Sequence, residues 1–358
     1  MALTATQKSY LWLDSFPLER TEKHALLRAA GDVVSLVKRF GEVAKSLLAK
    51  KADVYQAMCA SLQDGGAYFQ TLLGQMERQG VSFQCLEDDG YPMAWKGMEA
   101  SPLCVYYKGN LSLLKEKVFA IVGSRRTTES AKKIGKGIAK DLSSRFVILT
   151  GVADGGDEAA VEGALQGSGQ VACMLAGGFS FEPASAMLLG RVAEKGIVFS
   201  ACPMEEPVRV YSYEIRNRLL AALAQGGLVL GAAEKSGALI TAKYLRESQK
   251  PIFALPYAPG TAAGAGCNAL IKSGAYLTES AADILQQFGM DAAAKKSKIA
   301  LTDVEEKTLA ALQEKGEAHV NELSQATGIP PFKLLTVLSS LEIKGLAVKL
   351  GGNRFSAV

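Results

Sequence analysis

One glycine, one serine and two arginines follow the apolar run from Val118 to Val122, and a lysine-rich segment comes after them. The turn and the start of that segment supply five candidate ligands for an anion, namely Gly123, Ser124, Arg125, Arg126 and Thr128. Free amides at the start of a helix and the guanidinium group of an arginine both bind negative charge. These residue types therefore predict a site for a phosphate group or another anion.

Other predicted strand ends carry residues of the same kind. The stretch "TGVADGGD" follows a second apolar run, "YSYEIRNR" follows a later one, and "EKSGALITA" opens a further helical segment. In doubly wound sheets, ligands bind outside the carboxyl ends of the strands. We expect these stretches to meet at one rim, where their candidate residues are Thr150, Gly151, Asp157, Arg216, Asn217, Arg218, Lys235, Ser236, Gly237 and Thr241.

Each of these residues also has a simpler explanation. The glycines suit any turn from strand to helix, and Ser124, Thr128 and Ser236 could cap helices. Asp157 is interpreted as a carboxylate that orients an arginine or backbone amides, not as a general base. The hypothesis of an anion site depends on the combination, because three helix N-termini and several cations would converge on one rim.

An extended polyanion suits this rim better than a nucleotide. The chain has no G-x-x-x-x-G-K-[ST] motif, and "GKGIAK" (135–140) lies inside a helical pattern instead of at a strand end. Lys132, Lys136 and Lys140 repeat at a spacing that places them on one helix face, although a solvated face would look the same. Arg125 is the sharper candidate. We expect no cofactor and no metal ion.

The elements that must position these residues form an α/β fold. Short runs that are apolar throughout, such as "VFAIV", "FVILTG" and "VACMLAG", alternate with amphipathic stretches. The same pattern continues through "GIVFSA", "GLVLGAA" and "PIFALP". Strands buried on both faces and joined by crossover helices have this pattern. The sequence therefore predicts a doubly wound, Rossmann-like and mostly parallel sheet.

The predicted sheet lies between two other parts of the chain. Residues 1–78 read as helical, residues 79–290 as the sheet domain, and residues 291–298 ("DAAAKKSK") as a linker. Residues 299–358 show three helices and two strands around a Gly-Gly turn, the pattern of a winged helix. That segment carries six cations and seven anions, which favours contact with protein over contact with DNA. The N-terminal helices could pack or dimerise, or could grip a nucleic-acid backbone.

Composition excludes several classes of protein. The chain has 358 residues, of which 48% are hydrophobic and 21% charged, and its net charge is +4. We expect a folded, cytoplasmic protein without a membrane span, because no apolar run approaches the roughly 20 residues that a span needs. The six cysteines form no C-x-x-C pair, and the two histidines lie outside the central region. Metal clusters and histidine chemistry are therefore not expected there.

The motifs resemble those of the DNA-processing protein A (DprA/Smf) family. The similar stretches include "YPMAW", "LCVYYKGN", "VGSRRTT", "TGVADGGD", "RNR", "SGALITA", "FALP" and "GCNALIKSGA", in the family's order. The resemblance implies a sterile-alpha-motif-like N-terminal domain and a C-terminal winged helix. It also implies a groove for the backbone of single-stranded DNA, bordered by eight of the residues above: Gly123, Ser124, Arg125, Thr128, Arg218, Ser236, Gly237 and Thr241.

The function that this resemblance implies is that of a non-enzymatic mediator of recombination. Such a protein protects incoming single-stranded DNA during natural transformation and loads the RecA recombinase, and family members are typically homodimers through the Rossmann-like domain. The chain departs from the family's usual residues at several positions. Val161 replaces a histidine, Glu214 lies in a segment that is usually Phe-Pro-Arg, Gly231 replaces a glutamate and Tyr257 replaces a glycine. These departures bear on DNA affinity more than on fold.

Two other classes of function remain as alternatives. A nucleotide-processing enzyme of the phosphoribohydrolase type would also use a strand-end turn for phosphate, but those enzymes carry a Pro-Gly-Gly-x-Gly-Thr run. The stretch "GGLVLGAAEKSG" has no such run. A transcription factor acting through the winged helix is disfavoured by the charge of that segment.

Overall fold

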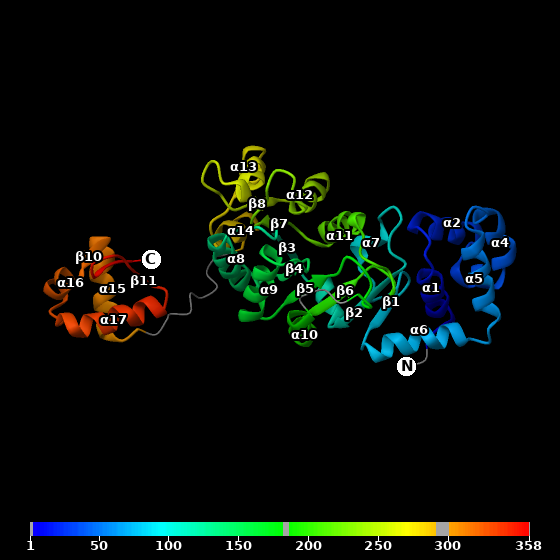
Figure 1. The fold of residues 1–358 in the computed structure, drawn as a ribbon, viewed down its shortest axis with the longest axis horizontal. Coiled ribbons are helices and arrows are strands. Elements are labelled where there is room, and N and C mark those ends of the chain that lie inside the picture. Colours follow the sequence, from blue (N-terminus) through cyan, green and yellow to red (C-terminus); the bar gives the residue numbers. More distant parts are fainter. Residues whose placement is uncertain (1–2, 182–185, 291–300, 358) are drawn as a thin grey trace. The chain divides into compact units, whose positions relative to one another are not determined.

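The computed structural model describes residues 3–181, 186–290 and 301–357. It divides into two compact units, Met1–Ala292 and Ala293–Val358, and each is described by itself (Figure 1). The predicted linker at 291–298 lies outside the described residues. Within the described ranges no helix is both long enough and apolar enough to cross a membrane.

The N-terminal part of the first unit is helical, as predicted. Apolar residues at helical spacing face a shared core, and caps mark the ends: Thr4 accepts a hydrogen bond from the Gln7 amide before the first helix, and Gly31 ends the second with φ +91°. The helices are α1 (Ala5–Ser15), α2 (Arg20–Ala30), α3 (Val33–Lys38), α4 (Phe40–Leu47), α5 (Ala52–Gln63) and α6 (Ala67–Arg78).

A nine-stranded sheet follows, in the order β1-β2-β6-β5-β4-β3-β7-β8-β9. Its strands are β1 (Ser82–Cys85), β2 (Cys104–Gly109), β3 (Val118–Val122), β4 (Val147–Thr150), β5 (Val171–Met174), β6 (Ile197–Ser200), β7 (Gly227–Val229), β8 (Ile252–Ala254) and β9 (Tyr276–Leu277). Strands β3 to β9 are parallel, whereas β1 and β2 pair antiparallel at one edge. The doubly wound, mostly parallel sheet is confirmed.

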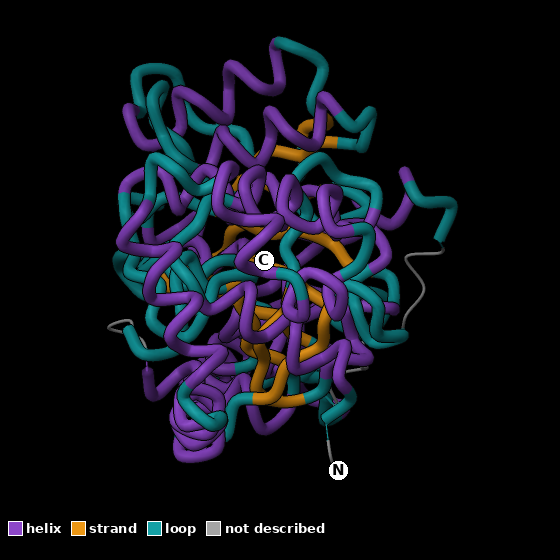
Figure 2. The backbone as a smooth tube through the Cα atoms, turned by 90° about the vertical axis from the view of Figure 1, so that its right-hand side faces the viewer, coloured by secondary structure: helices purple, strands orange, loops and turns teal. Residues whose placement is uncertain are grey.

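Helices cover both faces of this sheet (Figure 2). One face packs against α8 (Glu129–Leu142), α9 (Gly156–Gln166), α10 (Ala186–Lys195) and α14 (Ala281–Gln287). The other packs against α7 (Met93–Lys96), α11 (Val210–Leu223), α12 (Ala238–Glu247) and α13 (Ala265–Lys272), and short 3-10 turns lie at Leu111–Lys115 and Ala262–Gly264. The strand order reverses between β3 and β7, so this is the switch point at which such folds bind ligands.

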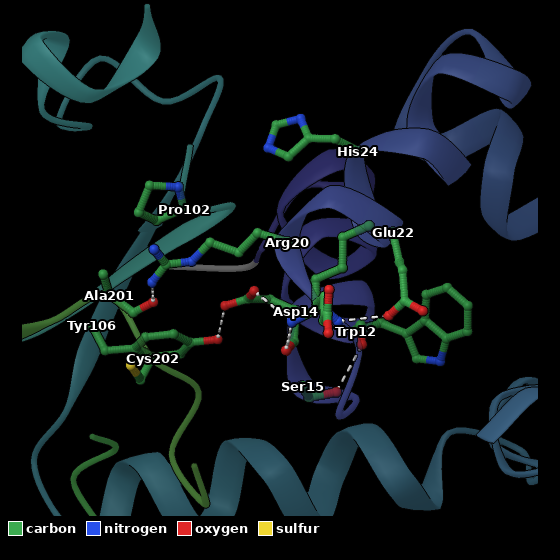
Figure 3. Close-up of polar contacts among 12 residues, drawn as sticks. Trp12, Asp14, Ser15, Arg20, Glu22, His24, Pro102, Tyr106, Ala201 and Cys202 are labelled. Atoms are coloured by element: carbon green, nitrogen blue, oxygen red, sulfur yellow. Dashed lines mark hydrogen bonds and ion pairs between the residues drawn. The ribbon is translucent and has the colours of Figure 1, made fainter. Parts of the chain in front are cut away.

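A buried polar cluster joins the N-terminal helices to the sheet (Figure 3). The Lys23 ammonium lies 3.0 Å from a carboxylate oxygen of Asp14, and the Tyr106 hydroxyl of β2 donates to the other oxygen at 2.9 Å. Nearby, the Arg20 guanidinium donates to the Ala201 carbonyl just after β6, at 2.9 Å. The helical layer therefore holds the chain just after β6, at the edge of the sheet where the parallel strands end.

The second unit has its own small core of leucines around Phe355. It consists of α15 (Asp303–Lys315), β10 (Glu317–His319), α16 (Val320–Thr327), α17 (Pro331–Ile343), β11 (Ala347–Lys349) and β12 (Arg354–Ala357). The last two strands pair antiparallel, and β10 pairs with β12 to complete a three-stranded sheet. This arrangement confirms the predicted winged helix.

Candidate functional site

Asp157 ties together two loops at the carboxyl ends of β3 and β4. Its carboxylate accepts a hydrogen bond from the Gly123 amide at 3.0 Å and another from the Ala153 amide at 3.3 Å. Burial raises the pKa of this carboxyl, while the Arg216 charge and the amides oppose that rise. Both contacts are with backbone amides, the kind of partner that the sequence interpretation gives to Asp157.

Arg216 approaches the same place from α11 on the other face of the sheet. Its guanidinium Nη1 donates to the Met174 carbonyl at the end of β5, at 3.1 Å, and the side chain is buried. A side chain at Gly151 would overlap both this guanidinium and the Asp157 carboxylate, so only glycine fits between them. Burial lowers the pKa of Arg216, and the negative charge of Asp157 acts against that effect.

The next residue of α11 reaches the opposite side of the switch point. The Asn217 amide group donates to the Gly237 carbonyl at 3.1 Å, and Gly237 lies directly before α12. Asn217 is buried, whereas Arg218 is exposed. One helix therefore positions both the β4/β5 side of the rim and the loop that leads into α12.

The turn after β3 lies at the centre of these contacts. The Ser124 amide donates to the Gly231 carbonyl at 2.8 Å, and the Ser124 carbonyl accepts from the Thr127 amide at 3.1 Å and the Gly156 amide at 3.3 Å. The backbones of Gly123 and Gly156 lie so close that a Cβ on either would clash with the other. The ends of β3 and β7 and the start of α9 thus converge, as the sequence predicts.

Four buried side-chain polar atoms in the described part of the chain have no hydrogen-bond partner of ordinary geometry. All four belong to predicted site residues: Ser124 Oγ, Thr150 Oγ1, Arg216 Nε and Thr241 Oγ1. Buried polar groups in folded proteins are nearly always paired, because an unpaired one costs about 1–3 kcal/mol. All four lie on predicted rim residues, so the rim is a place where unpaired polar atoms lower the free energy of unfolding.

A cavity of about 240 Å³ opens beside this turn. Its wall includes Arg125, Arg216, Tyr213 and Phe181 together with the backbone of Gly177 and Gly178. Arg125 is exposed, and so are the other rim cations Arg126, Arg218 and Lys235. The site is therefore a partly apolar hollow with exposed cations near it and hydrogen-bonded amides behind them. An anion with an attached apolar or aromatic group would satisfy both parts.

The remaining predicted residues have local roles. Thr128 caps α8 by accepting from the Ala131 amide at 3.4 Å, and the Ser236 hydroxyl accepts from the Ala238 amide at 3.3 Å. Lys132 and Lys136 form ion pairs with Glu129 and Glu162, so they belong to a solvated helix face.

Sequence reasoning did not assign Tyr213 and Phe181 to the site. Tyr213 lies beside Glu214 in the segment that departs from the family's usual Phe-Pro-Arg, and the one available signal for either residue is that it is aromatic and follows a predicted strand.

The described residues include no group of three His, Cys, Asp or Glu side chains that could hold a metal ion. All six cysteines are free; Cys85, Cys104, Cys173 and Cys267 are buried.

Known proteins of similar sequence process DNA. The chain is 34% identical over 210 residues to the DNA processing protein DprA of Streptococcus pneumoniae, which covers 58% of this chain and 74% of that protein. It is 30% identical over 293 residues to a putative DNA processing protein DprA of Mycobacterium tuberculosis, covering 75% of each chain.

Solved structures of similar fold come from the same group. The crystal structure of DprA from Streptococcus pneumoniae matches with a TM-score of 0.65 and 28% identity, covering 80% of this chain and 99% of that one. DprA of Helicobacter pylori, described for its mode of binding single-stranded DNA, matches with a TM-score of 0.53 and 25% identity, covering 59% of this chain and 97% of that one.

Two family models match most of the chain. The model described as DNA recombination-mediator protein A matches residues 82–289, which span the sheet and the whole candidate rim. The model described as the DprA winged helix domain matches residues 292–353. With the fold and the relatives in agreement, the chain belongs to the DNA recombination-mediator protein A (DprA) family.

Proposed function

We propose that this protein binds single-stranded DNA along the rim formed by the ends of β3, β4, β5 and β7. The observation that carries the proposal is the cluster of unpaired buried polar atoms on Ser124, Thr150, Arg216 and Thr241, bordered by exposed cations. Backbone phosphates would occupy the cationic border. The related protein of Helicobacter pylori is described as binding single-stranded DNA, which supports this ligand.

A flexible strand fits this rim better than a duplex does. Arg125 lies on the turn after β3 and lines a cavity of about 240 Å³, and the exposed Tyr213 ring in the same wall offers a surface for a base. Single strands can unstack a base and bend a phosphate into such a site, whereas a rigid duplex cannot.

The proposed role is that of a mediator without catalysis of its own. The protein would hold incoming DNA during transformation or recombination while the RecA recombinase, which hydrolyses ATP itself, nucleates on the strand. Asp157 supports this reading, because both of its oxygens are bound by backbone amides and it is poorly placed to take a proton from a substrate.

We further propose a homodimer through the free edge of the sheet. β9 lies at that edge, and its residues Tyr276 and Leu277 are 43% and 50% exposed. A groove of about 390 Å³ lies between α12 and α13, lined by Leu239, Ala242 and Leu270 among others. An exposed edge strand readily pairs with a second copy. Two copies would place two rims on one strand and raise affinity through effective concentration.

One experiment tests the ligand. Gel shifts with single-stranded and blunt duplex oligonucleotides of equal length, each at two salt concentrations, should show tighter binding of the single strand. The logarithm of the affinity should fall with the logarithm of salt by about 0.7 per phosphate contacted. Equal affinity for both DNA forms would reject the proposal.

Two further measurements test the proposed homodimer and the proposed loading of RecA separately. Sedimentation of the wild type and of Leu277→Lys should show a dimer and a monomer, respectively. The lag before RecA hydrolyses ATP on strands coated with a protecting protein should shorten when the wild type is added. A binder that leaves the lag unchanged is not a loader.

A further inference from the structure

Tyr257 is held in place from both ends at the switch point of the sheet. Its hydroxyl donates to the Leu230 carbonyl at the end of β7, at 2.6 Å. Its backbone is clasped by Asn268 of α13, whose side chain accepts from the Tyr257 amide at 3.0 Å and donates to the Tyr257 carbonyl at 2.9 Å. A half-buried tyrosine with three such bonds has one fixed orientation.

Two glycines make the room that this side chain occupies. A Cβ at Gly264 would overlap the Tyr257 ring. A Cβ at Gly231 would lie 2.8 Å from the Tyr257 hydroxyl oxygen and 2.7 Å from Thr127 Oγ1, closer than real Cβ atoms come to such atoms. Gly231 and Tyr257 are two of the departures from the family's usual residues, and the structure shows that they fit each other.

The Tyr257 hydroxyl bears directly on the predicted anion-binding turn. The Leu230 amide donates to the Val122 carbonyl at 2.9 Å, and the next carbonyl, that of Gly231, accepts from the Ser124 amide at 2.8 Å. Burial raises the pKa of the Tyr257 phenol, and the Thr128 hydroxyl opposes that rise, so the phenol also senses the start of α8. The phenol thus holds Leu230, the residue directly before the one whose carbonyl accepts from the Ser124 amide.

We propose that Tyr257 is a positioning residue for the turn from Ser124 to Thr128. It acts through the Leu230 and Gly231 carbonyls and sets where the turn presents its amides and Arg125. This inference rests on the proposed function, since the turn is taken to bind DNA phosphate. Gly231 is required for the same positioning, because any side chain there would displace the Tyr257 phenol.

The first test is Tyr257→Phe, which keeps the ring and removes only the hydroxyl. Affinity for a single-stranded oligonucleotide should fall about fivefold, the effect of losing one well-placed hydrogen bond. The matched control is Tyr55→Phe, which removes an exposed hydroxyl bonded to the Gly41 carbonyl among the N-terminal helices and should leave affinity unchanged. Equal affinity of Tyr257→Phe and wild type overturns the inference.

A second test asks whether the effect passes through the turn. In the Arg125→Ala background, Tyr257→Phe should weaken binding by less than twofold, since the group being positioned is already gone. A purely structural role would give the same loss in both backgrounds, and that additive result rejects the proposal. Should Tyr257→Phe fail to fold, Asn268→Ala replaces it, because that change removes the clasp and leaves the phenol.

A third readout needs no DNA. Hydrogen exchange of the peptide that contains Ser124 should be faster in Tyr257→Phe than in wild type, while peptides of α5 keep their rate. Unchanged exchange at Ser124 overturns the positioning role even if DNA binding holds. Faster exchange in Tyr257→Phe, together with a wild type that binds no single-stranded DNA, would instead reject the proposed function and leave the structural coupling intact.

Discussion

The Asp157 carboxylate and the Arg216 guanidinium lie on either side of Gly151, and both are more than nine-tenths buried. Asp157 belongs to α9 and Arg216 to α11, which cover opposite faces of the sheet, so the carboxyl ends of β4 and β5 are held from both faces. Opposite charges in a poorly solvated place stabilise each other only while both are present. The rim is therefore rigid behind its exposed cations.

Replacing Gly151 by alanine should disturb both charges. The added Cβ would overlap the guanidinium and a carboxylate oxygen, so we expect a loss of about 1–3 kcal/mol in the free energy of unfolding, together with weaker DNA binding. Denaturant unfolding measures the first effect. The matched control is Gly137→Ala within α8, where nothing lies near the added Cβ and stability should rise by about 0.5–1 kcal/mol. Similar values for the two variants would contradict this account.

Arg125 should matter to DNA and not to folding. It is exposed at the mouth of the cavity, and loss of a charge-assisted bond to phosphate should weaken single-strand binding by about 1–3 kcal/mol in Arg125→Ala. Fluorescence titration measures the change, and thermal unfolding should match the wild type. Lys140→Ala, which removes an exposed cation farther along α8, should have a smaller effect. An equal effect of both would point to net charge alone.

The buried ion pair between Lys23 and Asp14 predicts strong destabilisation when it is broken. Lys23→Ala leaves the Asp14 carboxylate with only the Tyr106 hydroxyl and its surroundings, and such losses cost about 3–5 kcal/mol. Tryptophan fluorescence suits the measurement, because Trp12 lies on the same helix as Asp14. Lys45→Ala, at an exposed position of α4, serves as the control and should change little.

The winged helix should lose stability in acid through Glu305. Hydrogen bonds from Lys344 and Ser340 lower the pKa of this carboxyl from 4.5 to about 2. Its contribution to stability is therefore complete above pH 4.5 and disappears as the pH falls toward 2. Methyl NMR signals of Leu312 and Leu338 would follow this core during the titration. Glu305→Gln should flatten the pH dependence in that range, and an unchanged profile would exclude Glu305 as its source.

Much of the fold follows from pattern alone. The strands β3 to β8 are apolar throughout because helices cover both of their faces, and such runs are visible in the sequence. β1 and β2 form an antiparallel edge with mixed burial, and β9 has only two residues. None of these three strands therefore has the run of apolar residues that reveals a central strand. The sequence therefore predicts the central strands, which helices cover on both faces, and does not predict the strands at the edges of the sheet.

The site was predictable as a set of residues but not as an arrangement. Arg216 and Arg218 look equivalent in "RNR", yet residues two apart on a helix point in nearly opposite directions. Only the packing of α11 decides that Arg216 is buried behind the rim and Arg218 is exposed. The contact between Tyr257 and Gly231 joins positions far apart in sequence, and no local pattern indicates it.

Because α11 carries Arg216 and Asn217 on adjacent positions, its rotational setting is shared by both halves of the rim. Inserting one residue into the first two turns of α11 would rotate the segment before the insertion by about 100° relative to the rest. An insertion before Arg216 would turn Tyr213 out of the cavity wall while Arg216 and Asn217 keep their contacts, whereas an insertion between Arg216 and Asn217 would separate the two anchors. Length variation should therefore not be tolerated between Tyr213 and Asn217. The segment from Pro203 to Val208 should resist it as well, because Met204 is buried and the Met204 and Glu206 carbonyls accept from the Ser180 and Gly178 amides. An insertion scan with DNA binding as its readout would test both expectations.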